Sequence, residues 1–349
     1  MFLALKEVLF NKLKFGLIIG VLVLISYLLF LVSGLSIGLM NMNKESIDKW
    51  KADAFVVTDE SNQNLAQSLF KASDVKDKFK ETASIKNLGV IIAKGEKKQN
   101  TMLFGIDKDE FLNPNVVEGK SFSKDFEVVA DDTLKEKGFK VGDELDLAGT
   151  DETLKIVGFT DQSKYNAAPI VYANMHTADV LSNQRLKGKV NALVIRDSKF
   201  KDVKLDDKYS LVDKDTFIKK LPGFTEQKLT LDIMSYFLFA ISACIIGIFL
   251  YIITIQKAAV YGLLKAQGIS TGFLARSLVL QTFVIGVFSV LIALLLTYGT
   301  QLALPPVVPI KFDLATIAIY AVTIIVMAVL GGLFSIRSIQ KVDPLKIIN

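Results

Sequence analysis

Residues 15–40 read FGLIIGVLVLISYLLFLVSGLSIGLM, a run of 26 residues that contains no charged side chain. A helix needs about 20 apolar residues to cross a hydrocarbon layer roughly 30 Å thick, and a soluble core helix rarely reaches that length without a charge. This run therefore predicts a transmembrane helix. Three further uncharged runs have the same character: Ile233–Gln256, Ser277–Ile310 and Leu314–Ile336. The sequence thus predicts an α-helical membrane protein with four spans.

The composition excludes several other classes of protein. The 349 residues are 51% hydrophobic and 22% charged, with a mean hydropathy of +0.41, which is too apolar for a disordered chain or an ordinary soluble one. The single cysteine, Cys244, forms neither an intrachain disulfide nor a cysteine metal site. Gly119-Lys120-Ser121 resembles the end of a phosphate-binding loop, but Pro114 occupies the position of the companion glycine. We expect a non-catalytic subunit with no metal site and no intrinsic cofactor.

Positive charge is concentrated in three short segments beside the apolar runs. Residues 1–14, 257–276 and 337–349 together hold nine Lys and Arg and two acids, Glu7 and Asp343, a net charge of +7 against +5 for the whole chain. Short basic segments stay in the cytoplasm. This distribution accounts for the pI of about 8.9 without a nucleic-acid partner. It predicts a multi-pass protein of the cell membrane whose N- and C-termini are cytoplasmic.

This orientation assigns every segment to one side of the lipid bilayer. Residues 41–232 become one extracytoplasmic domain of about 190 residues, which is large enough for its own core. The other segments follow in chain order: a cytoplasmic amphipathic helix at 1–14, spans at 15–40, 233–256, 277–304 and 314–336, a cytoplasmic coupling helix and loop at 257–276, an outer loop at 305–313 and a cytoplasmic tail at 337–349.

The inserted domain has the pattern of a mixed α/β fold. Leu65–Lys80 and Asp131–Lys137 are polar segments that predict helices. Asn41–Ala52 and Thr225–Asp232 look helical and continuous with the first and second spans, so we expect a two-helix stalk. Seven β-rich runs predict strands: Ala54–Thr58, Leu88–Ala93, Met102–Ile106, Glu127–Ala130, Leu154–Phe159, Ile170–Ala173 and Ala192–Arg196.

Residues 257–268 predict one short amphipathic helix in the cytoplasmic loop. Val260, Leu263 and Leu264 share a face, the lysines point away from it, and Gly268 suits a C-terminal stop. The pattern alone leaves two interpretations open. The helix is either a connector at the membrane surface or a coupling helix that docks in a groove on a cytoplasmic ATPase.

Several motifs in chain order resemble those of the MacB-type (type VII) ABC-transporter permeases. Tyr261-Gly-Leu-Leu-Lys-Ala-Gln-Gly268 is similar to the coupling-helix motif of the family, although many members carry Glu where this chain has Val260. The other matching segments are Ala4–Lys14, Gly105-Ile-Asp107, Gly119-Lys-Ser-Phe122, Val141-Gly-Asp143, Ile156-Val-Gly-Phe159 and Asp343-Pro-Leu-Lys346. The resemblance implies that ATPase coupling depends on Val260, Tyr261, Gly262, Leu263, Leu264, Lys265 and Gly268.

Within that family, three segments look most like the heme-exporter permeases of Gram-positive bacteria: Ile47–Ala52, Leu221–Thr230 and Lys265–Ser270. The resemblance implies a permease homodimer with two copies of a separate ATPase, which binds ATP and Mg²⁺. It also implies mechanotransmission, in which the stalks pass the movement of the ATPases to the outer domains. Heme would be the exported substrate and would be handled in the outer leaflet.

A heme site at the membrane boundary needs apolar walls, axial ligands for iron and a base near the propionates. The candidate heme-binding residues are Glu45, Glu226, Met40, Met234, Tyr236 and Tyr165, with Met42, Lys44 and Lys49 beside them. Each has a simpler interpretation: the methionines as packing residues, Tyr236 as an interfacial anchor and the glutamates as solvated stalk residues. The sequence leaves two roles open for Trp50, a cap at the lipid interface or a wall of the heme site. His176 is expected at the surface.

Two other functions fit the same four-span plan. One is export of a different amphiphile, such as a lipoprotein, a peptide or an antibiotic. The other is a regulator of cell-wall hydrolases that moves no substrate, for which an exposed apolar patch on the outer domain would be the sign.

Overall fold

The computed structural model describes residues 12–256, 258–305 and 308–340 of the chain. The chain divides into two compact units, one made of Met1–Gly38 with Leu229–Asn349 and the other of Leu39–Lys228. We call them the membrane unit and the outer domain. Most of the expected N-terminal helix and the Asp343-Pro segment lie outside the described residues.

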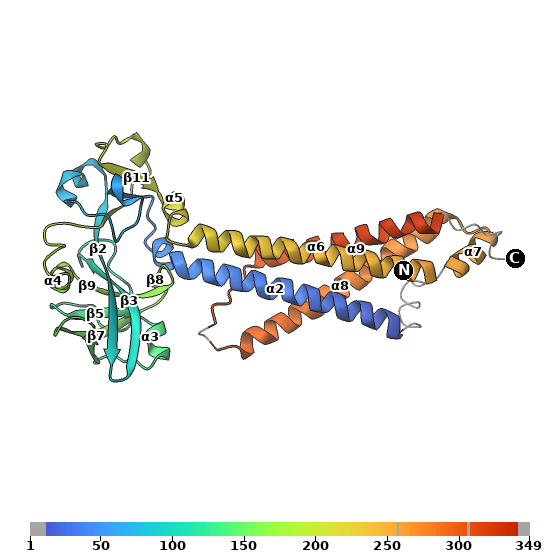
Figure 1. The fold of residues 1–349 in the computed structure, drawn as a ribbon, viewed down its shortest axis with the longest axis horizontal. Helices are drawn as coiled ribbons and strands as arrows, with labels where there is room; N and C mark the ends of the chain where they lie inside the picture. The colour runs from blue at the N-terminus through green and yellow to red at the C-terminus, as the bar shows by residue number, and fades with distance from the viewer. Residues whose placement is uncertain (1–11, 257, 306–307, 341–349) are drawn as a thin grey trace. The chain divides into compact units, whose positions relative to one another are not determined.

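Four of the described helices are long and apolar enough to cross a membrane, which confirms the predicted spans. They are α2 (Lys12–Lys49), α6 (Phe224–Gln256), α8 (Thr271–Ala303) and α9 (Leu314–Gln340) (Figure 1). Helices α2 and α6 continue beyond their apolar runs, so the flanking segments Asn41–Lys49 and Thr225–Asp232 are helical, as predicted. Helix α8 begins six residues before the predicted start of the third span, because the Ser270 hydroxyl accepts a hydrogen bond from the Phe273 backbone N–H and caps it.

Small residues mark the closest contacts in the membrane unit. A Cβ atom added at Gly38 of α2 would lie 1.5 Å from the carbonyl oxygen of Pro309, in the segment between α8 and α9. The Lys311 backbone N–H donates to the Gly34 carbonyl oxygen over 3.0 Å. The segment therefore lies directly on the backbone of α2. Helices α2 and α8 are also joined by a 2.8 Å hydrogen bond between the Tyr27 and Thr300 hydroxyls.

A mixed sheet forms the centre of the outer domain. In the part of the chain that the structure describes it has eleven strands, with the order β11-β1-β10-β2-β3-β9-β5-β7-β4, while β6 pairs with β2 and β7, and β8 with β9. Most neighbours are antiparallel, but β3 pairs with β9 and β5 with β7 in parallel. The strands are β1 (Ala54–Thr58), β2 (Thr82–Lys94), β3 (Lys97–Ile106), β4 (Val116–Gly119), β5 (Glu127–Asp131), β6 (Glu144–Leu147), β7 (Thr153–Thr160), β8 (Lys164–Tyr165), β9 (Ala168–Asn174), β10 (Ala192–Ile195) and β11 (Tyr209–Asp213).

Short helices flank this sheet. They are α3 (Thr133–Glu136), α4 (Met175–Leu181) and α5 (Lys214–Lys219). Each of the seven predicted strands coincides with one of the strands above, and α3 lies inside the predicted helix Asp131–Lys137. Strands β4, β8 and β11 were not predicted. The outer domain is therefore a mixed α/β fold inserted between the first and second spans.

The predicted helix Leu65–Lys80 is wrong. The segment forms only two 3₁₀ turns, Ala72–Asp74 and Lys76–Lys78. The buried Asn191 side-chain amide donates to the Leu65 and Ser68 carbonyl oxygens over 2.9 and 2.8 Å. These carbonyls are thereby engaged by the residue directly before β10, and this tertiary contact overrides the local helical preference.

Candidate functional site: the coupling helix and the stalk junction

Helix α7 (Ala258–Ala266) lies where the coupling helix was predicted. Gly268 has a φ of +86° just beyond its end, a conformation that favours glycine at a helix stop. Tyr261 is 8% exposed and packs with Leu274 and Leu278 of α8. Helix α7 is therefore held against the first turns of α8, so the two helices form one packed corner.

The apolar residues of α7 do not share one buried face. Leu264 packs with Tyr261 in the cluster on α8, whereas Val260 and Leu263 are 55% and 56% exposed. The prediction that Val260, Leu263 and Leu264 share one face of the helix is therefore wrong for Leu264. The large Tyr261 ring turns its side of the helix toward α8, which leaves an exposed apolar pair, Val260 and Leu263, one helical turn apart. Gly262 is buried and Lys265 half-buried.

The end of α2 is fixed to the outer domain by polar contacts. The Lys49 ammonium donates to the Asp161 carboxylate over 2.7 Å and to the Thr160 hydroxyl over 3.1 Å. The backbone N–H groups of Asn166 and Ala167, in the turn between β8 and β9, donate to the carbonyl oxygens of Asn43 and Met42. The hydrogen bond from Lys49 holds the pKa of the Asp161 carboxyl below its ordinary value, so Asp161 is ionised in this contact.

Trp50 extends this attachment into the core of the domain. It is 4% exposed, and its ring lies 5.7 Å from that of Phe104 and 6.4 Å from that of Phe55. The Arg196 guanidinium donates twice to the Trp50 carbonyl oxygen, over 3.0 and 2.8 Å. Trp50 is thus neither a lipid-interface cap nor a wall of a substrate site. It anchors the helix end in the domain core.

The two stalk segments are joined inside the outer domain. The buried Asn43 side chain of α2 donates to the Gln227 side-chain oxygen of α6 over 3.2 Å. Glu45 lies two residues after Asn43, and Glu226 lies directly before Gln227. The structure therefore brings the two candidate glutamates to neighbouring helical segments, with Glu45 half-buried and Glu226 exposed.

The other candidate heme residues differ in accessibility. Met40 is only 8% exposed, while Met234 and Tyr236 on α6 are 40% and 69% exposed. Tyr165 is 4% exposed and packs edge-to-face on Phe104, and burial raises the pKa of its hydroxyl. Such a phenol is neither accessible nor readily ionised as an iron ligand, so we leave Tyr165 out of the proposed site.

The lysines placed beside the candidate site have carboxylate partners already. Lys44 pairs with Asp48 over 2.9 Å, one helical turn away, and Lys49 with Asp161. Asp48 also contacts Lys214 over 3.2 Å. Both candidate propionate partners therefore stabilise the stalk junction, a role that the sequence did not indicate because Asp161 is 112 residues distant from Lys49.

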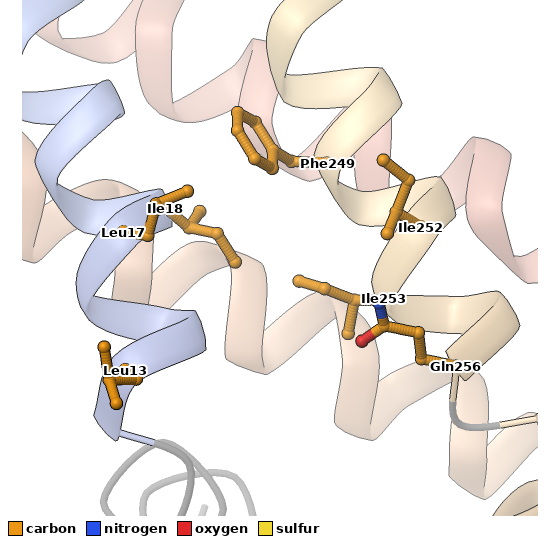
Figure 2. Close-up of a pocket in the computed structure, with 7 residues that line it drawn as sticks. All are labelled: Leu13, Leu17, Ile18, Phe249, Ile252, Ile253 and Gln256. Atoms are coloured by element: carbon orange, nitrogen blue, oxygen red, sulfur yellow. The ribbon is translucent and has the colours of Figure 1, made fainter.

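A groove in the membrane unit was not predicted from the sequence. It has a volume of about 270 Å³ between α2 and α6, and its lining is apolar apart from Gln256 (Figure 2). The side chains that line it are Leu13, Leu17, Ile18, Phe249, Ile252, Ile253 and Gln256. Such a surface suits lipid chains or another helix, and it carries no group for chemistry.

These features define a class of protein: a helical membrane subunit with a large mixed-sheet domain inserted between its first and second spans and a short helix with an exposed apolar pair. Comparison with known families agrees. Residues 15–207 match the family model for the MacB-like periplasmic core domain, and residues 233–344 match that for the FtsX-like permease C-terminal region. The chain belongs to the MacB/FtsX-type family of ABC-transporter permeases, whose members work with an ATPase partner.

Relatives match along nearly the whole chain. The putative hemin transport system permease protein HrtB of Staphylococcus epidermidis is 27% identical over 99% of each chain, and that of Staphylococcus haemolyticus is 24% identical over the same shares. An uncharacterized ABC transporter permease of Mycobacterium tuberculosis is 23% identical over 99% of this chain and 98% of its own. Among solved structures, the extracellular domain of the noncanonic ABC-type transporter YknZ from Gram-positive bacteria matches with a TM-score of 0.35 and 11% identity, over 46% of this chain and 99% of that one.

Proposed function

We propose that this permease exports heme from the cell membrane by mechanotransmission. The observation that supports heme as the substrate is the similarity to permeases named for hemin transport. This similarity extends over nearly the whole chain and so includes the stalk segments as well as the spans. Two copies of the chain assemble with two copies of a separate ATPase, which binds ATP and Mg²⁺. The chain itself hydrolyses nothing.

The orientation proposed here places both termini and α7 in the cytoplasm. Three short segments beside the spans carry a net charge of +7, and short basic segments are retained on that side. The description of the matching family domain as periplasmic supports the opposite side for Leu39–Lys228. Labelling of single cysteines in intact cells, in a Cys244→Ser background, tests this orientation: a cysteine at exposed Glu60 reacts with an impermeant reagent, and one at exposed Gln267 does not.

Movement enters through α7 and leaves through the stalks. Val260 and Leu263 contact the ATPase, and the packing of Tyr261 on α8 passes the displacement of α7 to the spans. At the other end, Lys49, Trp50 and the backbone of the β8–β9 turn fix the end of α2 to the sheet. A contact built from ion pairs, backbone hydrogen bonds and aromatic packing moves as one piece, which suits transmission of a pull.

Heme is held near the stalk segments by Glu45 and Glu226. A carboxylate oxygen is a ligand for ferric iron, and Asn43 and Gln227 keep the two helices together at that level. Met234 and Tyr236 are accessible on α6, so they are further candidates for contact with the macrocycle. Met40, which is buried, acts in packing.

Replacement of both glutamates tests the proposal. Cells with Glu45→Gln and Glu226→Gln are expected to lose most of their growth advantage on toxic heme, while assembly with the ATPase and protein level stay normal. The matched control is Glu60→Gln with Glu152→Gln, two exposed carboxylates elsewhere on the outer domain. Full heme resistance in the stalk double variant contradicts this site. If a deletion of the whole chain also leaves heme resistance intact, heme is not the substrate, and the chain either exports another amphiphile or regulates cell-wall hydrolases.

A further inference from the structure

A second cavity lies in the outer domain, separate from the stalk segments. Its volume is about 280 Å³. Ile106 and Phe122 lie at its base but are only 1% and 3% exposed, so the accessible part of the lining includes Lys108, Met175 and His176. The cavity thus combines one cation with two side chains that bind soft or borderline metals.

His176 is held in a defined orientation at this cavity. Its Nδ1 lies 3.1 Å from one oxygen of the Asp125 carboxylate. The other oxygen of Asp125 accepts a 2.6 Å hydrogen bond from the Asn174 side chain, which in turn caps α4 by accepting from the Thr177 N–H. Since Nδ1 is engaged by the carboxylate, Nε2 is the nitrogen that remains for a ligand. A histidine whose second nitrogen is fixed by a carboxylate is the usual arrangement at metal sites.

The composition of the cavity favours a metal porphyrin over a free metal ion. Among the residues that the structure describes, no group of three or more His, Cys, Asp and Glu side chains could hold a metal ion. A porphyrin supplies four nitrogen ligands itself, so one protein side chain completes an axial position. The half-buried Met175 offers an apolar contact for one edge of the macrocycle, and Lys108 fits a propionate. Asp107 also lines the cavity and disfavours a propionate on its side.

We propose that this cavity is a second heme-binding site, on the outer domain, in which His176 Nε2 is an axial ligand of the iron. The proposal rests on the proposed heme function and deepens it, because heme that leaves the membrane then has a contact on the domain that the stalks move. A volume of about 280 Å³ is at the small end of ligand pockets, so one edge of the macrocycle stays in water. Such a site releases heme readily, as an export route requires.

The simpler interpretation is that His176 and Asp125 only tie a loop to α4. Stability measurements do not separate the two, because both need the contact. A spectroscopic signature of iron ligation does, since a purely structural histidine does not alter the absorbance of bound heme.

The test is titration of ferric heme into the purified full-length permease in detergent, with absorbance in the Soret region as the readout. In the background of Glu45→Gln and Glu226→Gln, a histidine-type Soret band is expected to remain, and His176→Ala is expected to abolish it. Asp125→Asn is expected to weaken this remaining binding by about 10–100-fold, because the supporting carboxylate is lost. Free imidazole added to His176→Gly should restore the band.

Three controls keep the outcomes distinct. Arg185→Gln, in the same domain and outside the cavity lining, should leave the band unchanged. Metal-free protoporphyrin should bind without dependence on His176. Titration with Zn²⁺ in place of heme tests for a metal-ion site. Binding of Zn²⁺ that depends on His176 overturns the proposal.

Different results would overturn this inference and the proposed function. A wild-type Soret band that Glu45→Gln with Glu226→Gln removes, and that His176→Ala leaves intact, overturns the second site alone. If the wild-type protein gives no heme band at all, both are wrong. Circular dichroism of each variant shows that it is folded, and His176→Gln repeats the measurement with a side chain closer in size.

Discussion

Phe104 in the outer domain is fully buried among Trp50, Tyr165 and Tyr172, whereas Phe288 in the membrane unit leaves 59% of its surface exposed. Water drives the first arrangement, because apolar surface removed from water stabilises a fold. The second suits a helix surrounded by lipid, where exposure of a large apolar side chain costs nothing. The two units therefore depend on different contacts: large side chains in the outer domain, and close approach at small residues in the membrane unit.

The largest expected effect comes from truncation of the same residue type in each unit. Phe104→Ala should lower the free energy of unfolding of the outer domain by about 3–5 kcal/mol, since it leaves a cavity in the aromatic core. Phe288→Ala should change stability by less than about 0.5 kcal/mol. Thermal unfolding of the detergent-purified protein, followed by near-ultraviolet circular dichroism, measures both. Equal losses in the two variants would show that Phe288 is buried in the assembled transporter.

The second effect tests whether small residues stabilise the membrane unit. Gly38→Ala places a Cβ atom 1.5 Å from the Pro309 carbonyl oxygen, and this backbone neighbour cannot turn away. We expect a loss of about 1–3 kcal/mol, as for overpacking in a core. Gly20→Ala is the matched control on the same helix, because nothing lies within 4 Å of its added Cβ, and the better helix propensity of alanine should stabilise it slightly. Opposite shifts in thermal midpoint support the comparison, and a stabilised Gly38→Ala contradicts it.

The two units also differ in which sequence features predicted their structure. Apolar length alone identified all four spans, and alternating or continuous β-rich runs identified strands such as Leu154–Phe159 and Ala54–Thr58. Strand β11, Tyr209–Asp213, was missed because its pattern is short and interrupted by polar residues. The helix expected at Leu65–Lys80 failed because Asn191, more than 100 residues later, binds its carbonyls.

The candidate sites were predictable only where they are local in sequence. Helix α7 was predicted from its motif, but the side of it that faces α8 depends on Leu274 and Leu278. The anchoring of Trp50 and the pairing of Lys49 with Asp161 join residues far apart in the chain, and no periodicity indicates such contacts. His176 was expected at the surface, and its 63% side-chain exposure agrees, yet the supporting Asp125 was not apparent from the sequence.

A third, smaller effect distinguishes the packing of α7 on α8 from its proposed contact with the ATPase. Tyr261→Ala should cost about 1.5–2 kcal/mol, since its ring is buried against α8. Val260→Ser with Leu263→Ser should leave the thermal midpoint within about 0.5 kcal/mol of wild type, because both residues are exposed. The second variant should nevertheless lose the stimulation of ATP hydrolysis by the permease in the assembled complex. Normal stimulation in a folded Val260→Ser, Leu263→Ser protein would remove this pair from the ATPase contact.

The smallest effect concerns the Lys49–Asp161 ion pair at the stalk junction. Lys49→Met removes the hydrogen bond to Asp161, whose side chain is 46% exposed, so we expect a loss below about 1 kcal/mol at pH 7. The folded-state pKa of Asp161 lies below its ordinary value of 3.8, chiefly because of that hydrogen bond. Its contribution is therefore present above pH 3.8 and is lost as the pH falls through the depressed pKa.

The expected signature is a gap in thermal midpoint between wild type and Lys49→Met that is constant from pH 7 to about 5 and closes toward pH 3. Lys208→Met is the matched control, since Lys208 and Asp206 are 3.8 Å apart and mostly exposed, and it should show little gap at any pH. The membrane unit offers a neutral counterpart in the Tyr27–Thr300 hydrogen bond, so Tyr27→Phe should give a gap that does not change over this range. A gap for Lys49→Met that persists at pH 3 would mean that the lysine stabilises the junction through its bonds to the Thr160 hydroxyl and the Asp161 carbonyl oxygen, which do not titrate.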